Sequence, residues 1–384
     1  MTKADKEGQR KTPVLRFKGF TDDWEQRELN KTNDVRDGTH DTPKYIDSGY
    51  PLITSKNLTS SGTINFDDIS YISEDDFNFI NKRSNVDTND ILFGMIGTIG
   101  NPVLVGNDTN FAIKNVALIK KSDSINQYFL INILNSNIFK KYIIKTNQGN
   151  TQKFISLSQI RKFTFYAPQL YEQIEIGKIL QKIDSVITLY ERKIKALKKL
   201  KQAIFEVLNS IPHKSNVYRI SEIFDVTRGN VLSKKSISNK FSNMYPVYSS
   251  QTKNDGLLGY YSDYLFENSI TWTTDGANAG TVKYRTGKFY CTNVCGVLLN
   301  SEGYCNEYTA EVIEKETPKF VSHVGNPKLM NNVMKQIKIK LPDVATQQSY
   351  SDILLTFDNV CTSFCNKLND LNQIKNKLLN TMFI

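Results

Sequence analysis

The stretch PQLYEQIEIGKILQKIDSVITLYERKIKALKKLKQAIFEVL, residues 168–208, decides the fold, because it returns as PDVATQQSYSDILLTFDNVCTSFCNKLNDLNQIKNKLLNTM at residues 342–382. The copies align without a gap at an offset of 174, and 10 of their 41 positions are identical. Their apolar residues share one spacing, in which steps of three and four residues alternate. This rhythm over four heptads is typical of a coiled-coil seam, so the sequence predicts two long helices that pair along one stripe.

The predicted seam takes equivalent residues from both copies. It consists of Leu180, Ile183, Ile187, Tyr190, Ile194, Leu197, Ile204 and Leu208 in the first copy, and of Leu354, Phe357, Cys361, Phe364, Leu368, Leu371, Leu378 and Met382 in the second. One slot is polar in both copies, where Lys201 and Lys375 stand. A polar seam residue lowers stability but fixes register, and we expect the neighbouring Leu200 and Ile374 to shield it. Two unrelated amphipathic helices would explain neither the common offset nor the common polar slot.

An alternating strand is expected just before each helical copy. The segments KFTFYAP (162–168) and QIKIKLP (336–342) place their apolar residues on one face and end at the proline that opens the helix. The repeated unit is therefore a mixed domain, a strand, a proline and a long helix. To close a seam with the first helix, the second must run antiparallel to it. The sequence thus predicts an α+β fold, in which two mixed α/β domains in pseudo-twofold arrangement are joined by two long antiparallel coiled-coil helices.

The repeat also sets the expected domain boundaries. They are a disordered tail at 1–12, a first domain at 13–167, the central helix at 168–210, a second domain at 211–341 and the C-terminal helix at 342–384. In the first domain, turn signals separate runs such as TINFDDISYI (63–72) and VALIKK (116–121), which are typical of strands, while residues 127–144 have the pattern of one helix.

The second domain contains faint echoes of the first. The loose matches are DILFGMIGTIG (90–100) with SITWTTDGANAG (269–280), KNVALI (114–119) with TNVCGVL (292–298), and Gly149-Asn150 with Gly325-Asn326. Outside these landmarks the two domains are dissimilar. We therefore expect two related scaffolds that carry different surfaces.

Composition bounds the class of protein. The 384 residues are 39% hydrophobic and suffice for two or three ordinary cores. No apolar run is long enough for a membrane span, and the polar start has no signal-peptide core, so a cytoplasmic protein without membrane contact is predicted. The five cysteines are odd in number and confined to the C-terminal part, which argues against a disulfide framework, and with three histidines in the chain no zinc site is expected.

Catalytic signatures are missing from the sequence. It contains no GxxxxGK[ST] phosphate loop, no HExxH, no GxSxG and no Asn-Pro-Pro-aromatic motif of amino-methyltransferases. The GMIGTIG stretch (94–100) leads into the strand-like run NPVLV, whereas a dinucleotide-binding loop leads into a helix. We therefore expect no cofactor, no metal and no catalytic residue.

Net charge and polar loops point to nucleic acid. The formal net charge is +10, and Lys or Arg contacts to phosphates release condensed counterions. Loops rich in Ser, Thr, Asn, Gln and Lys supply side chains that bind phosphates and read base edges. The candidate DNA contacts are Lys56, Asn57, Thr98, Lys114, Asn115, Asn150, Gln152, Lys153, Arg228, Ser250, Gln251, Thr252, Lys253, Asn254, Thr274, Asp275, Asn278, Lys283 and Arg285.

With these features in place, nearly the whole chain resembles the DNA-specificity subunit of Type I restriction-modification enzymes. The opening PVLRFKGFTDDW (13–24) is similar to that family's start. DGTHDTPKYIDSGYPLITSKNL (37–58) resembles a first target-recognition domain, and YPVYSSQTKNDGLLGYY (245–261) with ITWTTDGANAG (270–280) resembles a second.

The resemblance implies a non-catalytic subunit that binds double-stranded DNA. Each recognition domain would read one half of a bipartite site, the paired helices would set the unspecified spacer, two methyltransferase subunits would dock, and motor-nuclease subunits would join for cleavage. Two alternatives stay open on the sequence alone. One is a single-chain DNA-modifying enzyme with methyltransferase or nuclease activity, and the other is a structural coiled-coil scaffold.

Overall fold

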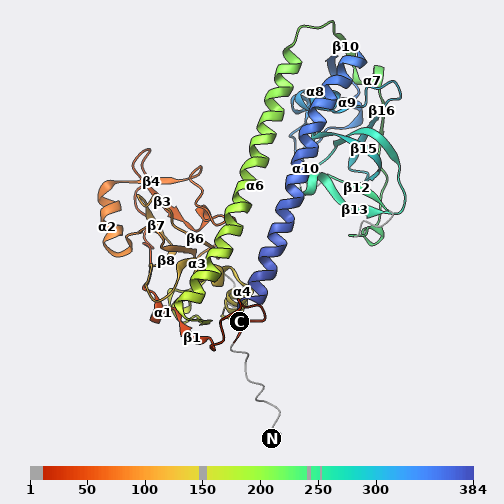
Figure 1. Ribbon diagram of the computed structural model, residues 1–384. Coiled ribbons are helices and arrows are strands. Elements are labelled where there is room, and N and C mark those ends of the chain that lie inside the picture. Colours follow the sequence, from red (N-terminus) through yellow and green to blue (C-terminus); the bar gives the residue numbers. More distant parts are fainter. Residues whose placement is uncertain (1–11, 147–153, 240–243, 251–252) are drawn as a thin grey trace. The chain divides into compact units, whose positions relative to one another are not determined.

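The computed structural model describes residues 12–146, 154–239, 244–250 and 253–384, which form two compact units. Unit 1 takes the chain up to Tyr190 together with Lys367–Ile384, and unit 2 is Glu191–Asn366. Each unit holds one α/β domain and a part of both long helices, α6 (Leu170–Ser210) and α10 (Val344–Thr381) (Figure 1). The tail expected at 1–12 lies almost entirely outside the described residues.

A two-stranded antiparallel ribbon joins the start of each domain to its end. In unit 1 it pairs β1 (Glu25–Glu28) with β9 (Thr164–Ala167), and in unit 2 it pairs β10 (Asn216–Arg219) with β17 (Lys338–Leu341). A single helical turn follows the first strand of each ribbon, α1 (Leu29–Thr32) and α7 (Ile220–Ile223). The second strand leads through a proline into α6 or α10, so the predicted strand-proline-helix step is confirmed at both places.

The domain of unit 1 contains two small sheets. The four-stranded sheet has the order β2 (Val35–Asp37), β8 (Val116–Ile119), β5 (Ile91–Gly94) and β6 (Gly100–Leu104), and the three-stranded sheet has the order β4 (Ser70–Ile72), β3 (Tyr50–Thr54) and β7 (Ala112–Lys114). The described helices are α2 (Glu74–Ser84), α3 (Gln127–Asn135), α4 (Asn137–Thr146), α5 (Leu157–Arg161) and a 3-10 turn, η1 (Ser55–Asn57). The main core forms where Trp24, Leu29 and α3 pack with β5, β8 and β9.

The domain of unit 2 has one six-stranded sheet. Its order is β11 (Asp225–Arg228), β16 (Cys295–Leu299), β14 (Phe266–Thr273), β15 (Val282–Cys291), β12 (Tyr245–Tyr248) and β13 (Leu257–Tyr261). The described helices are α8 (Glu307–Glu316) and α9 (Asn331–Met334), with 3-10 turns η2 (Lys234–Ser236), η3 (Lys253–Gly256) and η4 (Thr317–Phe320). Its core packs Phe205, Trp272 and Tyr308 with apolar residues of the sheet and of α8.

The two domains share one strand order. The run β2-β8-β5-β6 of unit 1 corresponds to β11-β16-β14-β15 of unit 2, and β7-β3-β4 corresponds to the end of β15 followed by β12 and β13. β3 is parallel to β7 as β12 is parallel to β15, while the other neighbours are antiparallel. The single long strand β15 therefore takes the places of both β6 and β7 in the shared strand order. This topology confirms the expectation of two related scaffolds.

Two local predictions in the first domain were wrong. The helix expected at 127–144 is two helices, because the chain breaks at Ser136, whose backbone N–H and hydroxyl both donate to the carbonyl of Ile133. The strand expected at 63–72 is limited to Ser70–Ile72. The predicted strand after GMIGTIG is confirmed as β6, so this stretch is the connection between the antiparallel strands β5 and β6 and not a nucleotide loop.

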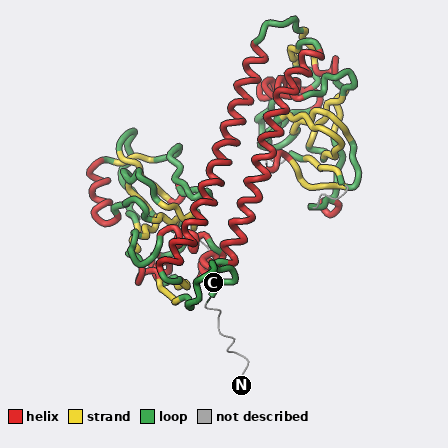
Figure 2. The backbone as a smooth tube through the Cα atoms, in the orientation of Figure 1, coloured by secondary structure: helices red, strands yellow, loops and turns green. Residues whose placement is uncertain are grey.

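The two helices pack against each other within each unit, as Figure 2 shows. In unit 1, Leu180 of α6 shares a core with Leu379 and Met382 of α10, and in unit 2, Leu208 of α6 shares a core with Leu354 of α10. Early residues of α6 meet late residues of α10 and the reverse, so the packing is antiparallel in both units. None of the predicted seam residues is exposed.

The polar slot of the seam is filled by ion pairs. In unit 2 the Lys201 ammonium lies 2.7 Å from Asp358, and in unit 1 the Lys375 ammonium lies 2.5 Å from Asp184. Both the lysines and the aspartates belong to the identical positions of the repeat. The expectation that Leu200 and Ile374 shield these lysines was wrong, since both side chains are about half exposed. A carboxylate from the facing helix neutralises each lysine instead.

A second repeated contact attaches each domain to its helix. Gln173 donates to the carbonyl of Pro168 at 2.8 Å and accepts from the backbone N–H of Asn126 at 3.0 Å. Gln347 donates to the carbonyl of Pro342 at 2.8 Å and accepts from the side chain of Asn306 at 3.1 Å. Asn126 and Asn306 are the N-caps of α3 and α8. The repeated glutamine therefore ties the start of each long helix to the same point of each domain.

Candidate nucleic-acid interface

Several loops of the first domain converge at one edge of its sheets, here called edge 1 (residues 37–42, 54–58, 95–100 and 114–115). Strands β2, β3, β5 and β7 all end there, because β3 and β7 are parallel and β2 and β5 each run antiparallel to β8. Thr39 N–H donates to the carbonyl of Ile113 at 3.0 Å, and Ser55 Oγ donates to the carbonyl of Asn115 at 3.1 Å. Gly38 permits this close approach, since an added Cβ would lie 2.1 Å from the carbonyl oxygen of Ile113.

A charged cluster stands at the centre of edge 1. The His40 ring faces an oxygen on both sides, with Nδ1 2.8 Å from Asn115 Oδ1 and Nε2 2.9 Å from Asp37 Oδ2. The Arg83 guanidinium donates to the other oxygen of the same buried carboxylate. The hydrogen bonds to Asn115 and Asp37 raise the pKa of His40 above its usual 6.5. The imidazolium form is therefore favoured, and it adds positive charge to a half-exposed position.

His40 and Arg83 are functional candidates that the sequence reasoning missed. His40 lies in the DGTH stretch directly after β2, so its place beside polar loops was a usable signal. Arg83 comes from α2, and only the fold brings it to Asp37.

The predicted contacts of the first domain fall into three groups. Lys56 and Thr98 are exposed, and Lys114 and Asn115 are half-buried, so these four lie where a ligand can reach them. Asn57 is buried and accepts from the backbone N–H of Thr54 at 2.9 Å, which shapes the loop. Asn150, Gln152 and Lys153 lie outside the described residues.

The second domain repeats this construction at edge 2 (residues 228–231, 249–250, 253–256, 274–281 and 292–294). Asn230 N–H donates to the carbonyl of Cys291 at 3.1 Å, as Thr39 does to Ile113 in the first domain. An added Cβ on Gly229 would lie 2.1 Å from the carbonyl oxygen of Cys291, the same distance as for Gly38. The two edges are therefore equivalent parts of related scaffolds with different side chains.

A cavity of about 250 Å³ opens at edge 2. It is lined by Ser249, Asp255, Gly256, Thr271, Trp272, Thr273, Asn278, Thr281, Lys283, Arg285 and Cys295. Arg285 donates to the Asp255 carboxylate at 2.7 Å, and its guanidinium carbon lies 3.8 Å from the ring centroid of Tyr248. The cavity gathers Asn278, Lys283 and Arg285, three candidates that are separated in the sequence.

The remaining candidates of the second domain differ in exposure. Arg228 donates to the side chain of Asn331 at 2.8 Å, and Ser250 and Asp275 are half-buried. Thr274 is buried and donates to the carbonyl of Val294 at 3.0 Å, so it shapes the loop as Asn57 does. Lys253 and Asn254 belong to η3. Gln251 and Thr252 lie outside the described residues.

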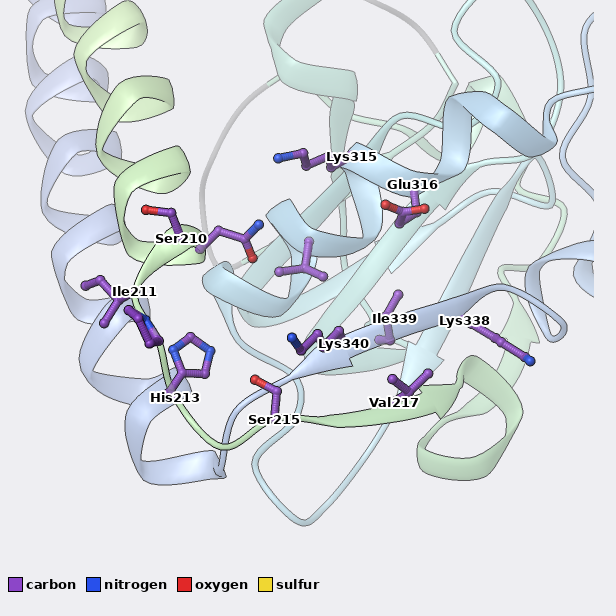
Figure 3. Close-up of a pocket in the computed structure, with 13 residues that line it drawn as sticks. Ser210, Ile211, His213, Ser215, Val217, Lys315, Glu316, Lys338, Ile339 and Lys340 are labelled. Atoms are coloured by element: carbon purple, nitrogen blue, oxygen red, sulfur yellow. The ribbon is translucent and has the colours of Figure 1, made fainter.

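A larger cavity of about 520 Å³ lies in unit 2 at the end of α6 (Figure 3). Ser210, His213 and Lys340 are among its lining residues, and none of the candidate DNA contacts is. It belongs to the joint between the helix, the ribbon β10–β17 and α8, and it is separate from edge 2.

Metal and membrane signals are absent from the described part of the chain. No group of three or more His, Cys, Asp or Glu side chains in residues 12–146, 154–239, 244–250 and 253–384 could hold a metal ion. No helix within these ranges is both long and apolar enough to cross a bilayer. All five cysteines are free thiols.

Comparisons with known proteins agree with this construction. The family model "Type I restriction modification DNA specificity domain" matches residues 21–199 and 212–376. A Mycoplasma pneumoniae sequence described as a type I specificity subunit N-terminus is 40% identical over 143 residues, which are 36% of this chain and 76% of that protein. The specificity subunit of the Mycoplasma pneumoniae Type I restriction enzyme MpnII is 37% identical over 147 residues, 38% of this chain and 44% of that protein. The match therefore spans less than half of that relative's length.

A solved structure shares the fold over nearly the whole chain. The S subunit of a Type I restriction-modification system from M. genitalium superposes with a TM-score of 0.67 at 18% identity. The match covers 97% of this chain and 99% of that one.

Proposed function

Because the chain belongs to the Type I restriction-modification DNA specificity family, we propose that it is the subunit that selects the DNA site of a methyltransferase complex. As a specificity subunit it has no catalytic role of its own, which fits the missing methyltransferase and nucleotide-binding motifs. Its ligand is double-stranded DNA with a bipartite site, and each domain reads one half. The comparisons favour this function over a single-chain DNA-modifying enzyme or a structural scaffold.

One observation carries the division of labour between the domains. Both present an edge of the same topology, closed by equivalent backbone bonds at Thr39 and Asn230, yet the side chains at the two edges differ. Edge 1 has His40, Asp37 and Arg83, whereas edge 2 has Arg285 stacked over Tyr248. Equal frames with unequal side chains suit two half-sites of different sequence, because base edges are read by side chains that the frame positions.

The long helices suit two further roles. Continuous helices of 41 and 38 residues are natural spacers, so we propose that they set the unspecified gap between the half-sites. They also carry exposed apolar residues at heptad spacing along the border of the seam. These are Ile179, Val186, Leu200 and Val207 in α6 and Ile353, Val360 and Ile374 in α10. Such a stripe fits partner helices, and we assign it to two methyltransferase subunits, with motor-nuclease subunits added for cleavage. The complex acts on DNA in the cytoplasm.

Exchange of one domain tests the proposal. Residues 220–337, between the ribbon strands β10 and β17, are replaced by the equivalent segment of a relative with another specificity. The ribbon and both helices stay unchanged, so assembly with the methyltransferase is preserved. We expect methylome sequencing to show that one half-site changes while the other half-site and the spacer stay the same.

A reciprocal exchange of residues 29–163, between β1 and β9, is the matched control and should change only the other half-site. If either exchange altered both half-sites, the domains would not act as separate readers. If the unmodified complex methylated DNA without sequence preference, the specificity function itself would be refuted.

A further inference from the structure

An exposed hairpin projects from edge 2, at residues 322–328. Ser322 and Lys328 exchange two backbone hydrogen bonds of 2.9 and 3.0 Å, which closes the hairpin. Gly325 has a φ of +73°, which a tight turn requires and which few other residues adopt. Residues 322–326 are all exposed. The hairpin is thus a defined projection with every tip side chain open to a ligand.

The base of the hairpin is fixed to the recognition loop. Gly276 N–H donates to the carbonyl of Pro327 at 3.0 Å, and Leu329 N–H donates to the carbonyl of Thr274 at 2.9 Å. Leu329 is buried, and its carbonyl accepts from the Trp272 indole at 3.0 Å. The tip therefore moves with the loop at 274–280 and with the core strand β14, so its side chains are held in place before any ligand binds.

The tip is apolar at its most exposed point. Val324 is 91% exposed, the highest value among the large hydrophobic side chains in the described ranges. Its neighbours are His323, Gly325 and Asn326, and Val231, which follows Arg228 at the same edge, is 79% exposed. A partner that covers these methyl groups removes apolar surface from water, which lowers the free energy of the complex. A phosphate contact would not need them.

We propose that the hairpin 322–328 is a specificity element of the second domain, in which Val324 contacts a thymine methyl group and Asn326 an adenine edge in the major groove. Apolar contact with the thymine methyl and amide contact with adenine N6 and N7 are the pairings that these side chains favour. Lys328 stands at the base, where its ammonium reaches a phosphate. The inference rests on the proposed DNA-reading function and adds the segment and base type that read one position.

The full chain, assembled with its methyltransferase, is tested on a DNA library in which each position of the second domain's half-site is varied in turn. Val324→Ser should relax discrimination at one A·T base pair by about fourfold for each methyl group no longer buried. Asn326→Ala should relax discrimination at an adjacent or nearby base pair. The first half-site should be read unchanged by both variants.

Val217→Ser is the matched control, because Val217 is an exposed valine on β10, away from edge 2. Val217→Ser should leave discrimination unchanged at every position of the half-site. At 91% exposure Val324 contributes little to the core, so its variant should keep the unfolding midpoint of unit 2.

Two results would overturn the inference. One is a Val324→Ser complex that reads all positions like the unmodified complex. The other is a variant that binds DNA normally but no longer assembles with the methyltransferase, since the tip would then contact protein. An unmodified complex without any sequence preference would refute the proposed function instead, so the two failures are distinguishable.

Discussion

Replacement of Lys201 by methionine should destabilise unit 2 far more than replacement of its repeat equivalent Lys375 destabilises unit 1. Lys201 is only 12% exposed and contacts three carboxylates, Glu307 at 2.6 Å, Glu311 at 2.7 Å and Asp358 at 2.7 Å. Lys375 contacts Asp184, whose side chain is 42% exposed. The same substitution therefore removes a buried hub in one unit and a surface pair in the other.

The expected magnitudes follow from burial. Glu307 is 7% exposed and Glu311 15%, so Lys201→Met leaves two carboxylates in a poorly solvated site. Loss of one partner of a buried ion pair costs about 3–5 kcal/mol. Lys375→Met leaves an aspartate that water can solvate, and exposed pairs contribute only about 0–1 kcal/mol. Methionine keeps the apolar stem at the seam in both variants, so packing differences are small.

The deficit of Lys201→Met should also depend on pH. Burial raises the pKa of Glu307 from its usual 4.5 to about 7, against the opposing effect of Lys201. Between these values the folded state binds more protons than the unfolded state, so this group lowers stability as pH rises through that window. Without Lys201 the pKa of Glu307 rises further. The free energy of unfolding of the variant should therefore be closer to that of the unmodified protein at pH 5 than at pH 8.

Two tryptophans allow each unit to be followed alone. Trp24 lies in the core of unit 1 and Trp272 in the core of unit 2, and the chain has no other tryptophan. Urea unfolding followed by fluorescence in a Trp24→Phe background reports unit 2, and in a Trp272→Phe background it reports unit 1. The free energy of unfolding is measured for each lysine variant in the matching background.

The double variant Lys201→Met with Glu307→Gln serves as the rescue. The neutral amide removes the unpaired charge at position 307. The double variant should therefore recover a large part of the free energy of unfolding that Lys201→Met loses at pH 8. The reasoning is refuted if Lys201→Met costs no more than Lys375→Met, or if the double variant is no more stable than Lys201→Met alone.

Three further predictions concern the proposed function. Hydrogen bonds to Asn115 and Asp37 raise the pKa of His40 above its usual 6.5, against desolvation by burial and the charge of Arg83. The charge of His40 is present below this raised pKa and lost above it, so affinity for the first half-site should fall as pH rises through that value. His40→Gln should flatten the pH profile of affinity, measured by fluorescence anisotropy. Leu200→Glu with Ile374→Glu should abolish co-elution with the methyltransferase in size-exclusion chromatography without unfolding the chain, whereas Lys199→Glu with Gln373→Glu should not, because only the first pair belongs to the apolar stripe. Seven residues inserted after Tyr190 and after Asn366, at the unit boundary in each helix, keep the heptad register and add about 10.5 Å. The spacer of the methylated motif should therefore lengthen by about three base pairs. An active complex with the original spacer would refute the proposal that the helices set the gap.

Periodicity made the helical frame predictable. A seam with steps of three and four residues depends only on local order along one helix, and every predicted seam residue is shielded in the structure. The ion pairs of Lys201 and Lys375 were not predicted, because each aspartate comes from the other helix and Glu307 and Glu311 from α8. Partners this far apart in the sequence are known only once the chain register is known.

The recognition edges were predictable only in outline. Loop polarity selected Asn278, Lys283 and Arg285 as candidates, and the structure gathers them around one cavity. The same criterion also selected Asn57 and Thr274, whose side chains are buried against backbone groups. Polarity cannot tell a side chain that shapes a loop from one that faces a ligand. It also overlooks Val324, an apolar side chain whose exposure becomes visible only in the folded hairpin.

The identical positions of the repeat separate into groups with different physical causes. Pro168 and Gln173, with Pro342 and Gln347, form the joint between helix and domain, and the repeated Asp and Lys form the ion pairs of the seam. Leu180 and Leu197, with Leu354 and Leu371, lie in the seam itself.

Three further identities lie on the exposed surface of the long helices, where the Lys193 ammonium also lies 5.7 Å from the ring centroid of Phe364. Ile179, Val186 and Lys193 match Ile353, Val360 and Lys367, and all six are exposed. Their heptad spacing places them in one row along each helix, each directly before a seam residue, so they border the seam. Identity on an exposed face, between domains whose recognition edges differ, is what two copies of one partner would require. This supports the proposal that a repeated frame binds two equal methyltransferase subunits while its unequal edges read an asymmetric site.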